Sequence, residues 1–228
     1  MTELKDFAAS AVVVGRLNPL IFSPEWLHSN NVIGPEEAAV AREHGIEVMA
    51  PNISSIVLGS MKLIVEDERF FLTVSDEPLV RAKDFAANCF QLLSHTPVVA
   101  VGLNFNASLS AGDLKQWHRF GDAIAPKEPW GNFVQDENGD RLGGVRGIVM
   151  ERNQSLGQRA GFVRFSLHVA EGAEHVANLQ VNNHFALGTS AEPKSGAEAY
   201  KIIEEFWDEA YEYSTGLFKN IKATADAA

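Results

Sequence analysis

The sequence predicts an α+β fold: a curved, mainly antiparallel sheet packed against a long C-terminal helix, plus one or two shorter helices. Two runs of alternating apolar and polar residues, 161–171 and 176–187, are separated by four residues and predict an antiparallel hairpin. The stretch from Ser195 to about Ile221 then carries apolar residues at helical spacing. A hairpin followed by a helix with a broad apolar face predicts that the helix covers one side of the sheet.

The elements before the hairpin follow from local signals in the chain. A proline at the first helical position indicates where a helix begins, and a glycine after the last turn indicates where it ends. Alternation with a period of two indicates strands. The predicted elements are a strand at 11–22, a short helical turn from Ser23 and Pro24, a helix near 35–44, two or three strands within 54–75, a helix from about Leu79, a strand at 97–106 and a helix at 113–124.

A second hairpin is predicted between the helix at 113–124 and the polar connection at 154–160. The dipeptide Asn138-Gly139 is typical of a tight reverse turn, because both residues tolerate positive φ angles. Strands near 131–135 and 141–152 would flank this turn.

The hairpin at 161–187 has a predicted register as well. If Glu171 and Val176 close it, one register keeps both apolar sets on the same face of the sheet. That register pairs Val163 with Phe185, Phe165 with Asn183, Leu167 with Val181 and Val169 with Leu179. The opposite face then pairs Arg164 with His184, Ser166 with Asn182 and His168 with Gln180.

Five residues of this hairpin are the candidate site for a ligand or partner: Arg164, His168, Asn182, Asn183 and His184. Four of them belong to the polar face of the hairpin, which either binds a molecule or is the solvated face of an antiparallel sheet. Asn183 falls on the apolar face, where an unpaired amide would cost about 1–3 kcal/mol. It is therefore hydrogen-bonded in the core, re-aimed by a bulge at 182–183, or directed into a pocket under the helix.

A single domain covering 1–228 is the economical organisation, because no flexible linker divides the chain. The order of strands and helices also allows two fused halves, about 1–124 and 125–228. No residue-level repeat supports that division.

The net charge of −11 makes nucleic acid an unlikely partner. The segment 141–164 departs from this balance, since it holds five arginines and one acidic residue, Glu151. These arginines either bind an anion or pair with the acidic side of the long helix.

We expect a soluble, cytoplasmic protein. Cys89 is the only cysteine, so no intramolecular disulfide can form. Residues 1–7 lack the basic start and apolar core of a secretory signal. The apolar runs are much shorter than the roughly 20 residues of a membrane helix, so no membrane association is expected.

Neither a catalytic signature nor a cofactor motif is recognisable. Asp136, Asn138 and Asp140 begin like a calcium loop, but Arg141 and Gly147 occupy the positions that require glycine and glutamate. The seven histidines are scattered without ligand spacing. We therefore predict no catalytic residue, no metal and no cofactor.

The residues favour a non-enzymatic binding or assembly component, with a protein partner or self-association as a homodimer. Aromatic residues on the flank of the long helix could extend into such a contact. The alternative is a small-molecule binder or hydrolase with a pocket between the sheet and the long helix, where Asn183, Asn104 and nearby histidines would converge.

Overall fold

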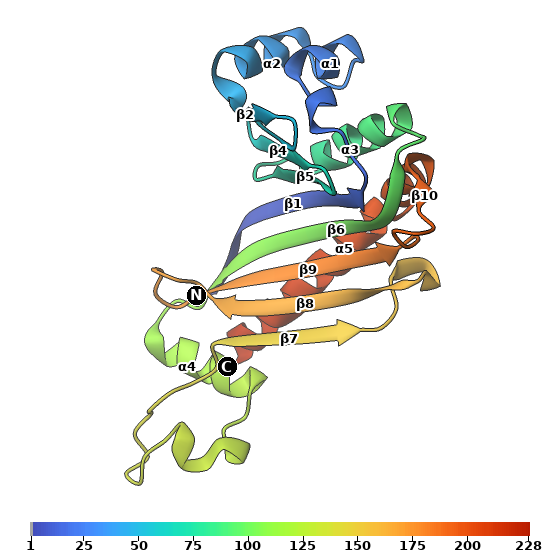
Figure 1. Cartoon of the computed structure of the whole chain (residues 1–228). Helices are drawn as coiled ribbons and strands as arrows, with labels where there is room; N and C mark the ends of the chain where they lie inside the picture. The colour runs from blue at the N-terminus through green and yellow to red at the C-terminus, as the bar shows by residue number, and fades with distance from the viewer. Residues whose placement is uncertain (1) are drawn as a thin grey trace.

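A computed structural model describes residues 2–228 and has the predicted α+β class. A ten-strand antiparallel sheet packs against a long C-terminal helix and shorter helices (Figure 1). The strands are β1 (Glu3–Gly15), β2 (Ile46–Ala50), β3 (Ile53–Leu58), β4 (Met61–Glu66), β5 (Arg69–Val74), β6 (Pro97–Ser110), β7 (Gly147–Arg152), β8 (Gly161–Val169), β9 (Val176–Ala186) and β10 (Lys194–Ser195). The helices are α1 (Pro24–Ser29), α2 (Pro35–Val40), α3 (Arg81–Leu92), α4 (Leu114–Ile124) and α5 (Gly196–Ala227).

The strands lie in the order β2-β3-β4-β5-β1-β6-β9-β8-β7, with β10 beside the start of β6. The two longest strands, β1 and β6, are neighbours in the middle of the sheet. β2 and β7 are therefore the two edges. Helices α3 and α5 pack side by side on one face, and the opposite face of β1, β6, β9, β8 and β7 is uncovered (Figure 1).

Helix starts agree with their sequence signals. Ser23 accepts a hydrogen bond from the backbone N–H of Trp26, and Pro24 occupies the first turn of α1. Asp113 caps α4 in the same way, through the backbone N–H of Gln116. These caps begin the helices where the sequence predicts them, because the signal depends only on residues within one turn.

The helical spacing of the apolar residues predicts Tyr213 on the buried stripe of α5 and Phe218 on its flank. Tyr213 is instead 38% exposed, whereas Phe218 and the polar Ser214 are fully buried. Trp207 packs edge-to-face on Phe105 of the sheet, with ring centroids 5.2 Å apart. The helix is rotated toward its Ser214 side because α3 packs beside it and adds a second surface to cover.

The observed register of the β8–β9 hairpin corrects the prediction. Val163 lies opposite Asn183 and Phe165 opposite Val181, a shift of two residues. The last pair is Val169 with Ala177, because the turn is wider than expected. The backbone N–H of Ala170 donates to the carbonyl of Val176 and closes the turn. Since the shift is even, every side chain keeps its predicted face of the sheet.

The strand predicted near 131–135 is absent, and the strand predicted at 141–152 begins only at Gly147. A 3₁₀ turn occupies Glu128–Phe133, and a single bridge joins Gln135 to Arg141. The reverse turn at Gly139 is present, with φ +86°. Pro129 lies in the first turn of the 3₁₀ segment, where its missing N–H costs nothing.

The first predicted strand is also displaced toward the N-terminus. β1 begins at Glu3 and ends at Gly15, and Pro19–Ile21 form a 3₁₀ turn within the range predicted as strand. Pro19 ends the extended conformation because it cannot donate to a strand neighbour.

Candidate functional site

The uncovered face of the central sheet holds four of the five predicted site residues: Arg164, His168, Asn182 and His184. They are not isolated, because the strand registers align polar residues across six adjacent strands. This polar row consists of Thr73 (β5), Ser10 (β1), Asn104 (β6), Asn182 (β9), Arg164 (β8) and Glu151 (β7).

The middle of the polar row is buried although no helix covers it. The Asn104 side-chain amide donates to the Ser10 hydroxyl at 3.2 Å, and both residues are buried. The neighbouring Asn182 keeps a buried Oδ1 atom for which residues 2–228 offer no hydrogen-bond partner. A buried acceptor without a donor is a position where a bound molecule or water can gain a hydrogen bond.

Arg164 and His184 gather around one aromatic ring. Arg164 forms an ion pair with Glu151 at 2.7 Å and lies 4.6 Å above the Phe162 ring centroid. His184 also stacks on Phe162, with ring centroids 4.5 Å apart and ring planes 15° apart. Burial, and then the positive charge of Arg164, lowers the pKa of His184 below its usual value. The imidazole is therefore held neutral near pH 7.

His168 lies apart from this cluster, beside a groove of about 430 Å³ on the same face. Asp6 lines the groove too, because a β-bulge between Lys5 and Ala8 gives it φ +53° and turns it away from the regular alternation. The other lining side chains that carry hydrogen-bonding groups are Asn106, Ser108, Ser166, Asn178 and Gln180. Ala107 and Leu179 also line the groove, so it offers both hydrogen-bonding groups and apolar surface.

Asn183 lies on the opposite face, under α5, and is fully buried. Its side-chain amide donates to the Leu103 carbonyl at 3.1 Å and to the Ser214 hydroxyl at 3.3 Å. Core hydrogen bonding, one of the three predicted possibilities, is therefore the observed one. Asn104 faces the other side of the sheet, so the two asparagines do not converge on one pocket.

The arginine block is mostly paired. Arg141 binds both carboxylate oxygens of Asp122, at 2.7 and 2.8 Å, and Arg159 reaches Glu205 of α5 at 3.1 Å. Arg152 lies 5.3 Å from the Tyr213 ring centroid. Arg146 is exposed and has no carboxylate partner among residues 2–228. Only one arginine of the block thus pairs with the acidic side of the long helix.

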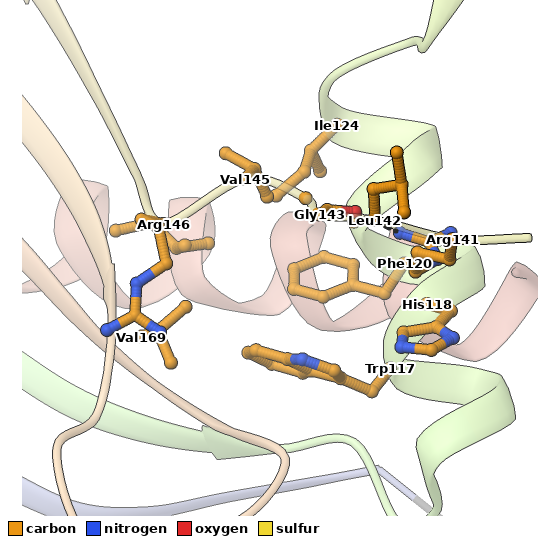
Figure 2. Close-up of a pocket in the computed structure, with 13 residues that line it drawn as sticks. Trp117, His118, Phe120, Ile124, Arg141, Leu142, Gly143, Val145, Arg146 and Val169 are labelled. Carbon is orange, nitrogen blue, oxygen red and sulfur yellow. Dashed lines mark hydrogen bonds between the residues drawn. The ribbon is translucent and has the colours of Figure 1, made fainter. Parts of the chain in front are cut away.

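A cavity of about 400 Å³ lies between α4, the segment 141–146 and the end of β8 (Figure 2). Trp117, Phe120 and Ile124 line it from one side of α4, since their spacing puts them on one helix face. Arg146 lies across from Trp117 and Phe120 (Figure 2). Phe120 is also part of the core, with Trp117 and Ile124 packed against it, and Arg141 and Arg146 line the cavity from segment 141–146.

Nucleophilic and metal chemistry find little support in the described residues. Cys89 is fully buried, and burial raises the pKa of its thiol far above the usual value. Within residues 2–228, no cluster of three or more histidine, cysteine or acidic side chains is arranged to hold a metal ion. No helix in this part of the chain is both long and apolar enough to cross a bilayer.

Comparison of the sequence with models of protein families and with curated proteins gives no match.

Proposed function

We propose that this protein is a non-enzymatic assembly component of the cytoplasm that associates with a second copy of itself through the edge strand β7. One observation carries the proposal: β7 has a strand neighbour on one side only in residues 2–228, and its side chains Val149 and Met150 are 57% and 66% exposed. An edge strand with exposed apolar side chains favours pairing with another strand.

The other edge, β2, is less suited to pairing. It also exposes apolar side chains, but a register shift between Ile46 and Val48 interrupts its ladder. Glu47, at that irregularity, pairs with Lys62 at 2.8 Å and places a charge beside the edge. Bulges and charges are the features by which natural sheets block edge pairing. β7 has an unbroken register with β8 and no proline, and its two charged residues, Glu151 and Arg152, stand at its C-terminal end.

Antiparallel pairing of β7 with itself would bring its apolar side chains together. If the two-fold axis passes through Val149, the two Val149 side chains meet on the uncovered face. Ile148 of one copy then lies opposite Met150 of the other on the helix side. Such cross-strand apolar pairs contribute roughly 0.2–1 kcal/mol each, and the two sheets would become continuous.

The test is the molar mass in solution, measured by light scattering and sedimentation over a range of concentrations. We expect the wild-type chain to have twice the chain mass, and both Val149→Lys and Met150→Lys to have the mass of one chain. Val80→Lys is the matched control, because Val80 is 42% exposed and lies outside the sheet. A wild-type protein that stays monomeric at every concentration, or β7 variants that stay dimeric, would overturn the proposal.

A further inference from the structure

The cavity beside α4 is separate from the strand surface on which the assembly proposal rests. A second cavity, of about 270 Å³, shares with it Gly121, Arg141, Val145 and Arg146 as lining residues. Pockets for small molecules usually measure about 300–1,000 Å³ and are mostly apolar with a few polar groups. The two cavities together fit that description.

The walls provide an apolar surface with aromatic rings. Trp117 and Phe120 are neighbours on α4, with ring centroids 6.2 Å apart, and Val169 closes the far end from β8. At the second cavity, Trp130 and Phe133 are 56% and 79% exposed. Exposed apolar residues that gather at one cavity mark a ligand-binding groove more often than residues scattered singly do.

The charges around the two cavities are positive in an otherwise acidic chain. Arg141 and Lys127 share one carboxylate, Asp122, at 2.7 and 3.2 Å. Arg146 lines both cavities and has no acidic partner among residues 2–228. The lining therefore holds three cationic side chains against one carboxylate, although the whole chain carries −11.

His118 adds a neutral polar group at the edge of the first cavity. Burial, and then the nearby charge of Arg141, lowers the pKa of this imidazole below its usual value. The imidazole is accordingly uncharged at pH 7 and can both donate and accept a hydrogen bond. It neither adds to nor cancels the positive charge.

From this arrangement we infer that the two cavities, together called the α4 cavity, bind a small organic anion: a carboxylate or phosphate carried on a flat apolar body. Arg146 binds the anionic group, since a guanidinium without an internal partner offers paired donors to planar oxyanions. Trp117, Phe120 and Trp130 pack against the apolar body. This inference is independent of the β7 assembly, because it uses different side chains.

The test uses two probes of nearly the same shape, 2-naphthoate and its uncharged amide, 2-naphthamide. Binding is followed by calorimetry and by the indole N–H signals of Trp117 and Trp130 in NMR spectra. We expect saturable binding of naphthoate that shifts both indole signals. The amide should bind at least about tenfold more weakly, because it lacks the charge-assisted hydrogen bonds.

Variants separate the cavity from nonspecific attraction. Arg146→Gln should weaken naphthoate binding at least about tenfold and leave binding of the amide unchanged, whereas Arg146→Lys should retain part of the affinity. Arg152→Gln is the matched control, because it removes one arginine of the same block outside the cavity. Trp130→Ala should weaken both probes.

Three results would overturn the inference: no saturable binding of naphthoate, equal affinities for acid and amide, or equal losses in the Arg146 and Arg152 variants. The thermal unfolding of each variant checks that its fold is intact. Arg146 and Trp130 are both exposed, so substitutions there leave the core untouched.

Discussion

Asn183 joins the sheet to the long helix through a single amide. Its two donor contacts reach Leu103 on the neighbouring strand β6 and Ser214 on α5. Its Oδ1 atom is buried without a hydrogen-bond partner in residues 2–228. The residue therefore satisfies its donors and leaves its acceptor unpaired, a state that a buried side chain adopts only at a cost in free energy.

Asn183→Asp should lower the free energy of unfolding by about 3–5 kcal/mol at pH 7, because it places a carboxylate where no water reaches. Burial raises the pKa of such an acid in the folded state, so the folded protein binds the proton more tightly than the unfolded chain does. The loss should be small below about pH 4 and grow as the pH rises. Urea unfolding at several pH values measures it.

Asn178→Asp is the control for this experiment, since Asn178 is exposed on the same strand. Its unfolding free energy should differ little from that of the wild type at any pH. An Asn183→Asp protein as stable as the control at pH 7 would show that water reaches the site.

At the scale of elements, α5 contains two glycines with opposite surroundings. Gly196 lies in the first turn, where an added Cβ would overlap the carbonyl oxygen of Leu93 after α3. Gly216 lies in the middle of the helix, where an added Cβ would meet no atom within 4 Å. The first glycine permits close packing of two segments, whereas the second only loosens the helix.

Gly216→Ala should therefore raise the free energy of unfolding by roughly 0.5–1 kcal/mol, because alanine has the higher helix propensity. Gly196→Ala should lower it by about 1–3 kcal/mol, since the Leu93 carbonyl must move. Chemical denaturation of both variants checks the two signs. A stabilised Gly196→Ala protein would mean that the α3–α5 contact shifts easily.

At the scale of the whole molecule, one continuous sheet links the two parts of the chain. β1 pairs with β6 along most of its length, and α3 packs against α5. The element order is similar on both sides of this seam: a long central strand, a helical segment, an antiparallel meander and a helix. The similarity concerns topology only.

We expect a single cooperative unfolding transition, because separating the two parts would expose the longest strand pair and the buried faces of α3 and α5. Far-UV circular dichroism and tryptophan fluorescence should give the same midpoint, and the calorimetric and van't Hoff enthalpies should agree. Gly196→Ala should shift the whole transition. Two separated transitions would instead support two fused halves.

Local signals were sufficient for much of the fold. The caps at Ser23 and Asp113, the alternation in β8 and β9 and the apolar spacing in α5 act within a few residues, so they indicate the type and approximate place of each element. The alternation also placed Asn182 and Asn183 on opposite faces. The predictions were wrong in the strand expected at 11–22, in the register of the β8–β9 hairpin and in the strand expected near 131–135.

The site was only partly predictable for a related reason. Arg164, His168, Asn182 and His184 share a face because their parity along the strands fixes it. Their neighbours Ser10 and Asn104 depend on which strands are adjacent, and strand order is not encoded locally. The α4 cavity forms because Trp117 and Arg146 line the same space, and no spacing in the sequence indicates that they are close.

The sequence by itself determined the α+β class, the amphipathic hairpin, the long terminal helix and the face of each hairpin side chain, because periodicity and caps are properties of neighbouring residues. The tertiary structure alone decided the register of the hairpin, the rotation of α5, the exposed edge β7 and the pairing of the arginines. Each of these depends on turn geometry or on which segments pack together. They are set by the balance of burial and hydrogen bonding over the whole chain.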